Sequence, residues 1–164
     1  MKGGAGMRTK VLAVFPSGEQ QALLCNIANH SDWDLEFAQT FQEARVALRG
    51  ARTAIVISEC CLPDGHSWKD LLDEISTLAD LPKLIVASRS AEHRLWAEVL
   101  SLGAYDLVAL PFDATDMRHV LKSAWLSWKQ ATAPEATIQR WAETASRRGV
   151  QQLDAGPSIT INSP

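Results

Sequence analysis

An acidic residue at the end of an apolar segment is the chain's first candidate for chemistry. Residues 54–57 are apolar, and they are followed by Glu59 and then by a turn that contains Pro63, Asp64 and Gly65. In an open sheet of parallel strands, ligands and reacting groups gather outside the carboxyl ends of the strands. The position of Glu59 therefore indicates a functional carboxylate at the edge of a sheet.

The segments that must position Glu59 alternate between strand and helix patterns. Short apolar runs predict five strands, at residues 10–15, 33–37, 53–58, 84–87 and 106–110. Helical spacing follows each of them, with expected starts after Ser17, Thr40 and Ser67, at about Ser90 and at Ala114. Parallel neighbours need crossover helices, so the pattern predicts an α/β fold with a doubly wound, five-stranded parallel sheet.

Glycines and composition mark the expected boundaries. Gly50 and Gly103 are placed to end the second and fourth helices. We expect a disordered leader at residues 1–8 and one domain at residues 9–129. Residues 130–164 are predicted to hold a linker, a short amphipathic helix and a loose tail, because they are too few for a second core.

Composition narrows the possible partners and the compartment. The net charge of -3 shows no excess of Lys and Arg that could bind phosphates, so we expect no nucleic-acid partner. The three cysteines form no C-x-x-C pair, which favours a reducing cytoplasm. The first ten residues lack a signal-peptide core, and no apolar run is long enough to span a bilayer. Together these features predict a cytoplasmic protein without a membrane segment.

Four local signatures in order along the chain suggest a family. They are Leu62-Pro63-Asp64-Gly65 after the third strand, Ser88 at the end of the fourth, Gly103-Ala104 before the fifth and Pro111-Phe112 after it. With these spacings, residues 8–129 resemble the response-regulator receiver domain, also called CheY-like. The resemblance implies a flavodoxin-like sheet with strand order 2-1-3-4-5. Another flavodoxin-like sheet with the same alternation remains the alternative.

The resemblance implies a phosphoacceptor site whose chemical parts can be compared with this chain. Receivers carry an aspartate at the end of the third strand, an acidic pair after the first that helps to hold magnesium, a hydroxyl after the fourth and a lysine after the fifth. In this chain the aspartate position is Glu59, and the acidic pair falls on Phe15 and Pro16. The hydroxyl position is Ser88, and the lysine position is Leu110. The aromatic residue common in the fifth strand falls on Leu107, whereas Ser88 and Asp64 are retained.

These substitutions remove countercharges that phosphoryl transfer needs. Losing one electrostatic contributor costs about 3 to 4 kcal/mol in a transition state, and Glu59 also carries one extra methylene. We therefore expect a pseudo-receiver that is not an enzyme, holds no metal or cofactor and acts in signal transduction without phosphorylation. Two alternatives stay open: a receiver that is still modified in a phosphorelay by an unconventional route, and a small enzyme or ligand-binding domain of flavodoxin-like fold.

Three polar residues near the sheet edge have simpler interpretations beside the functional ones. Glu59 either mimics a phosphorylated state by reaching Ser88 or is a solvated acid; if it is buried beside Leu110, desolvation should raise its pKa, with Arg89 as a possible countercharge. Ser88 is expected to cap the following helix. His66 is expected to be an exposed turn histidine.

The fourth helix should present an apolar face to a partner. Trp96 and Leu100 lie four residues apart, as do Leu95 and Val99, so one pair must face outward or be covered. Ile138 and Trp141 in the tail provide such a cover or a docking element of their own. We expect a protein partner, and the resemblance adds a homodimer through the face formed by the fourth helix, the fifth strand and the fifth helix.

Overall fold

The computed structural model describes residues 9–16, 18–29 and 33–132. The chain divides into two units, Met1–Gln130 and Ala131–Pro164, and the fold given below is that of the first. Several sequence-based expectations lie outside the described residues: the leader, the cap at Ser17, and the tail helix with Ile138 and Trp141.

Five parallel strands form one sheet in the order β2-β1-β3-β4-β5, which confirms the predicted fold class. The strands are β1 (Thr9–Val14), β2 (Trp33–Ala38), β3 (Ile55–Glu59), β4 (Lys83–Ser88) and β5 (Asp106–Ala109). The central strands β1, β3 and β4 read as nearly continuous apolar runs because both of their faces are covered. In contrast, β2 lies at an edge and exposes Asp34 and Glu36.

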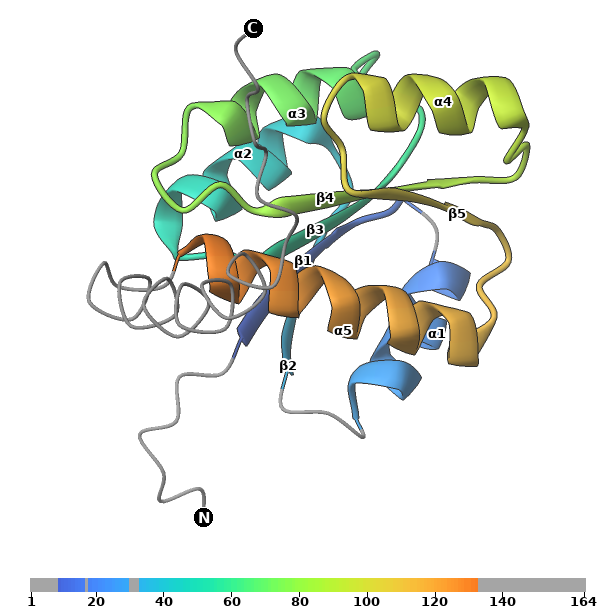
Figure 1. The fold of residues 1–164 in the computed structure, drawn as a ribbon, viewed down its shortest axis with the longest axis horizontal. Helices are drawn as coiled ribbons and strands as arrows, with labels where there is room; N and C mark the ends of the chain where they lie inside the picture. The colour runs from blue at the N-terminus through green and yellow to red at the C-terminus, as the bar shows by residue number, and fades with distance from the viewer. Residues whose placement is uncertain (1–8, 17, 30–32, 133–164) are drawn as a thin grey trace, which may run out of the picture. The chain divides into compact units, whose positions relative to one another are not determined.

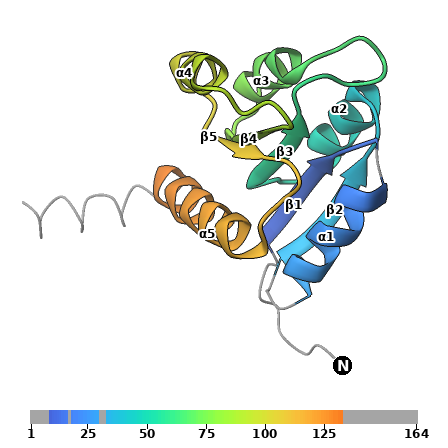
Figure 2. The ribbon, with the colours of Figure 1, turned by 90° about the vertical axis from the view of Figure 1, so that its right-hand side faces the viewer.

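Helices cover both faces of the sheet, as Figures 1 and 2 show: α2, α3 and α4 lie on one side, and α1 and α5 on the other. Their bounds are α1 (Gly18–Ala28), α2 (Phe41–Gly50), α3 (Trp68–Ser76), α4 (His93–Ser101) and α5 (Ala114–Ala131). Each side holds its own cluster of buried apolar side chains. The side of α5 that faces the sheet is apolar, since Met117, Leu121 and Ala124 are buried.

Two predicted helix starts are confirmed by their capping hydrogen bonds. The Thr40 hydroxyl accepts the Glu43 amide at 3.2 Å. Ser67 forms a capping box with Asp70, whose carboxylate accepts the Ser67 amide at 2.8 Å. Each cap satisfies amides that have no partner inside the helix.

The two glycines expected to end helices behave differently. Gly103 has φ +102°, in the left-handed region that follows many helix ends. Gly50 is the last residue of α2 and is not among the positive-φ glycines, while the following Ala51 is extended with φ −156°. The helix therefore ends at Gly50 as predicted, but without a left-handed cap.

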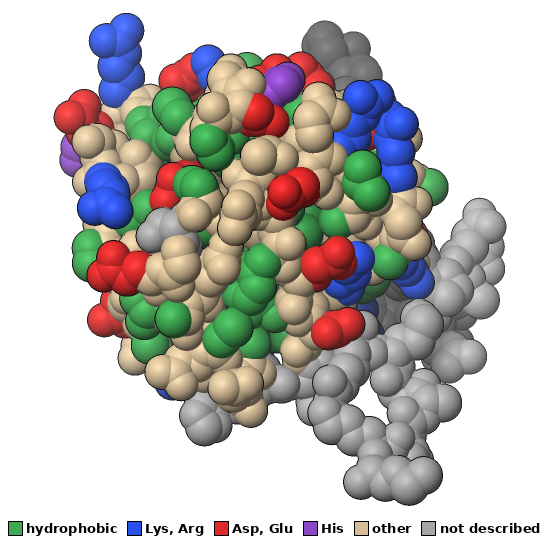
Figure 3. All heavy atoms as spheres, turned by 180° about the vertical axis from the view of Figure 1, so that it is seen from behind, with side chains coloured by type: hydrophobic (Ala, Val, Ile, Leu, Met, Phe, Trp, Pro, Cys, Tyr) green, Lys and Arg blue, Asp and Glu red, His purple; other side chains and the backbone are tan. Residues whose placement is uncertain are grey.

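Figure 2 places α4, β5 and α5 at one edge of the sheet, and β2 with α1 and α2 at the other. Figure 3 shows the side away from α4 and α5, where hydrophobic, acidic and basic side chains are interspersed. No helix within the described residues combines the length and hydropathy of a bilayer span.

Candidate functional site

Aromatic side chains pack together at the position to which the sequence resemblance assigns an acidic pair. Phe15 directly follows β1, and its side chain is 0% exposed. Its ring meets Phe112 edge-on, with 5.6 Å between the ring centroids and an interplanar angle of 83°. The Phe15 amide donates to the carbonyl of Ala38 at 2.9 Å, which fixes the backbone here. Pro16 is exposed, and neither side chain offers an oxygen to a metal ion.

Leu110 lies on the same side of the sheet as Phe15, at the end of the edge strand β5. It follows β5, is nearly buried and belongs to the same apolar cluster as Phe15 and Phe112. Its amide donates to the carbonyl of Ser88 at 2.9 Å, which ties the end of β5 to the end of β4. Apolar side chains therefore lie at the carboxyl ends of both β1 and β5.

Glu59 ends β3 and is half-buried. Burial raises the pKa of the Glu59 carboxyl above its ordinary value of 4.5, and the positive charge of Arg89 opposes part of the rise. The sequence-based expectation for this pKa is confirmed, because desolvation penalises the charged form and Leu110 supplies no countercharge. Among the described residues, Glu59 makes no side-chain hydrogen bond to Ser88.

Ser88 is engaged by its neighbours. Its hydroxyl oxygen accepts the Ser90 amide at 3.1 Å. Burial raises the pKa of the Cys60 thiol, and the nearby Ser88 side chain acts in the opposite direction. The expectation that Ser88 caps the next helix is wrong: α4 begins at His93 with Glu92 as its N-cap residue, because residues 89–90 form a bend first.

The turn after β3 contacts the start of α2 through a hydrogen bond and a ring stacking. The Asp64 carboxylate accepts the Phe41 amide at 3.0 Å. The His66 ring stacks on Phe41 with 4.3 Å between centroids, and its Nδ1 lies 3.5 Å from Asp64 Oδ2. His66 is half-buried, so the expectation of an exposed turn histidine is wrong; the stacking partner lies too far away in the sequence to be recognised there.

The fifth strand carries a nearly buried leucine, Leu107, at the position to which the resemblance assigns an aromatic residue. Leu107 packs into the cluster on the side of α2, α3 and α4. Tyr105, two residues earlier, packs on the opposite side, and its hydroxyl lies 2.5 Å from the Ser123 hydroxyl on α5. Tyr105, the aromatic residue just before β5, therefore contacts α5.

Helix α4 turns one apolar pair outward, as predicted. Val99 is buried and Leu95 packs against the core, whereas Trp96 is 49% and Leu100 37% exposed. Leu102, just after the helix, is also exposed. This part of the fold thus presents large apolar side chains on its surface, close in sequence to the edge strand β5.

At the carboxyl edge of the sheet, β3 and β4 end with Glu59 and Ser88, and Phe15 and Leu110 follow β1 and β5, whereas Asp64 is hydrogen-bonded to the start of α2. Within the described part of the chain, no three His, Cys, Asp or Glu side chains are grouped so that they could hold a metal ion. This edge therefore carries one half-buried carboxyl and one hydroxyl, and the residues after β1 and β5 are apolar.

Comparisons with known proteins bear on the fold. No protein-family model and no curated protein matches the sequence. The signal receiver domain of a putative Luxo repressor protein from Vibrio parahaemolyticus is 22% identical, with a TM-score of 0.71 over 76% of this chain and 95% of that one. Chemotaxis response regulator CheY4 of Vibrio cholerae is 18% identical, with a TM-score of 0.65 over 72% and 99%.

A further solved structure, the beryllofluoride-activated NtrC4 receiver domain dimer, is 19% identical, with a TM-score of 0.66 over 73% of this chain and 98% of that one. At these identities the likeness concerns the fold. The chain has the fold of response-regulator receiver domains, as its sequence predicts.

Proposed function

We propose that this chain is an atypical receiver that acts in signal transduction by binding a protein partner, without being phosphorylated. The observation that carries the proposal is the packing of Phe15 against Phe112, with Leu110 in the same cluster. These side chains fill the places from which a working receiver would neutralise a phosphoryl group and its metal ion.

The energetics support an inert phosphoacceptor position. Catalysis of phosphoryl transfer is chiefly positioning and electrostatic stabilisation. Removing one such contributor costs about 3 to 4 kcal/mol, and here the acidic pair and the lysine are replaced together. The carboxyl of Glu59 is also desolvated, and its extra methylene moves its oxygens away from an in-line geometry.

The partner is proposed to dock on the face made by α4, β5 and α5. Trp96 and Leu100 are exposed on α4, and exposed aromatic side chains are frequent anchors of protein interfaces. A receiver of the same fold is described as a dimer, so a second copy of this chain is one candidate partner. We place the interaction in the cytoplasm, in keeping with three free cysteines.

A phosphodonor experiment tests the inert site. The full chain is incubated with acetyl phosphate and magnesium and its intact mass is recorded, beside a receiver that has the acidic pair and the lysine. We expect the control receiver alone to gain the mass of one phosphoryl group. A stable adduct on this chain that disappears in Glu59→Ala would overturn the proposal.

A further inference from the structure

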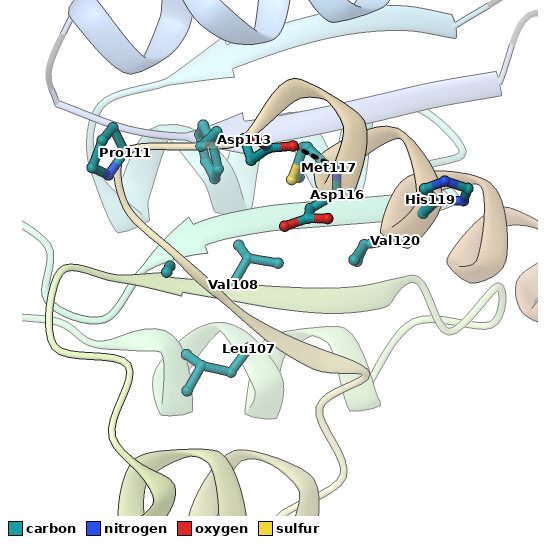
Figure 4. A pocket seen from close by; sticks show the side chains of 10 residues that line it. Leu107, Val108, Pro111, Asp113, Asp116, Met117, His119 and Val120 are labelled. Atoms are coloured by element: carbon teal, nitrogen blue, oxygen red, sulfur yellow. Dashed lines mark hydrogen bonds between the residues drawn. The ribbon is translucent and has the colours of Figure 1, made fainter.

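A groove runs between β5 and the first turns of α5 (Figure 4). Its volume is about 370 Å³. The residues that line it come from β5, the loop after it and α5, and those used below are Val108, Pro111, Asp113, Asp116, Met117 and Val120. Because β5 is the last strand of the sheet, this groove lies beside an edge that no further strand from residues 9–16, 18–29 or 33–132 covers.

The inside of the groove is apolar. Val108 points from β5 toward α5, and Val120 points from α5 toward the strand (Figure 4). Met117 is buried beneath them, and Pro111 is exposed at one end. A groove with this lining holds an apolar side chain away from water, and such burial is the main source of affinity at protein interfaces.

Two exposed carboxylates lie at the start of α5, on the rim of the groove. Asp113 accepts the Asp116 amide at 3.0 Å, which is a helix-capping contact. That contact uses one oxygen of Asp113 and leaves the Asp116 carboxylate unengaged. Neither residue forms an ion pair with any residue of 9–16, 18–29 or 33–132, whereas Glu36, Glu74, Asp80 and Glu98 all do.

We infer that this groove binds a peptide segment of a different protein, in which a Lys or Arg lies next to an apolar side chain. The apolar side chain enters between Val108 and Val120, and the cation meets Asp113 and Asp116. The inference rests on the proposed function, since it names the partner's chemistry for part of the same face. Charge here contributes specificity and rate of association more than affinity.

The carboxylates also argue against a second copy in this groove. Two copies docked groove to groove would bring Asp113 and Asp116 against the same two carboxylates, and like charges repel. His119, on the same helix, is the one titratable residue of basic type in the lining. The groove therefore fits a basic partner better than its own surface.

Selection from a library of short random peptides displayed on phage, with the full chain as bait, tests the inference. We expect enriched peptides to carry Lys or Arg beside a large apolar residue. The double variant Asp113→Asn, Asp116→Asn should weaken their binding about two- to fivefold for each charge, and added salt should remove the difference. Asparagine caps helices as well as aspartate, so the fold is retained.

The matched control is Asp34→Asn, which removes an exposed charge from β2 on the far side of the sheet. It should leave peptide binding unchanged, and a melting curve checks that each variant is folded. Ala109→Trp, which fills the groove from the exposed end of β5, should abolish binding.

The peptide selection overturns the inference if no peptide is enriched, if acidic peptides are enriched, or if binding is the same in the double asparagine variant. If binding is instead lost in Trp96→Ala alone, the docking face of the proposed function stands and the groove assignment fails. If sedimentation shows a dimer that the two asparagines disrupt, the occupant is a second copy and the inference is equally overturned.

Discussion

The Asp64 carboxylate accepts a hydrogen bond from the backbone amide of Phe41, 23 positions earlier in the chain. The turn after β3 is thereby held on the first turn of α2. Asp64→Ala should lower the free energy of unfolding by about 0.5 to 2 kcal/mol, as the loss of a helix cap does. Urea unfolding measures this, with the exposed Asp73→Ala on α3 as the control. Equal effects of both variants would contradict a capping role.

Phe15 should be among the costliest positions to truncate. The side chain is fully buried and packs on Phe112, so Phe15→Ala should destabilise the fold by about 3 to 5 kcal/mol. The exposed Leu126→Ala on α5 is the control and should change stability by less than about 0.5 kcal/mol. A mild effect at Phe15, similar to that at Leu126, would mean that this side chain does not fill the strand ends.

Glu59 should make stability fall as pH rises. Its pKa is raised in the folded protein, so the folded state binds more protons than the unfolded state between the two pKa values. Stability is therefore lost as pH rises from about the ordinary value of 4.5 through the raised one. Glu59→Gln should be at least as stable as the natural chain at neutral pH, with the advantage fading in acid.

Arg89 provides the control for that titration. Its charge lowers the pKa of Glu59, so Arg89→Gln should raise this pKa further and shift the pH dependence upward. Carbon NMR of the Glu59 carboxyl measures both effects. A titration at or below the ordinary value would show that desolvation is not the dominant cause.

Trp96 should matter to binding and hardly to folding. It is 49% exposed, so Trp96→Ala should change stability by less than about 0.5 kcal/mol. Recovery of the partner from an extract of the native organism should fall at least about tenfold, as for an interface anchor. Val46→Ala, at a position 73% exposed on α2, is the control and should leave recovery unchanged. Equal loss in both variants would place the docking surface elsewhere.

Two glycines should respond oppositely to alanine. Gly103 has φ +102°, which costs a residue with a Cβ about 1 to 2 kcal/mol, so Gly103→Ala should destabilise. Gly50 is helical, and a Cβ there meets nothing within 4 Å, so Gly50→Ala should stabilise by about 0.4 to 1 kcal/mol. Thermal or urea unfolding measures both, and the same sign for both would refute the assignment of backbone conformations.

The fold could be predicted because its signals are local. Apolar runs separated by helical spacing identified all five strands, and Thr40 and Ser67 marked helix starts through contacts only a few residues long. The start of α4 was misplaced because Ser88 resembles a cap, although its hydroxyl bonds to the Ser90 amide in a bend.

The site could be predicted only in part, because its partners are distant in sequence. The apolar residues Phe15 and Leu110 could be located by alternation and resemblance. The stacking of His66 on Phe41 and the hydrogen bond from the Phe41 amide to Asp64 join residues that are distant in the sequence, so no local pattern predicts them. The D-x-x-D spacing of Asp113 and Asp116 was a readable capping signal, but the adjoining groove depends on how α5 lies against β5.

The rings of Phe15 and Phe112 have a consequence for control under the proposed function. A signalling domain whose strand ends are filled by these two rings would not be switched on by phosphorylation or off by hydrolysis of a phosphoryl group. Its output would then follow the amount of the protein, so that synthesis, degradation and competition among ligands would set the strength and duration of the response.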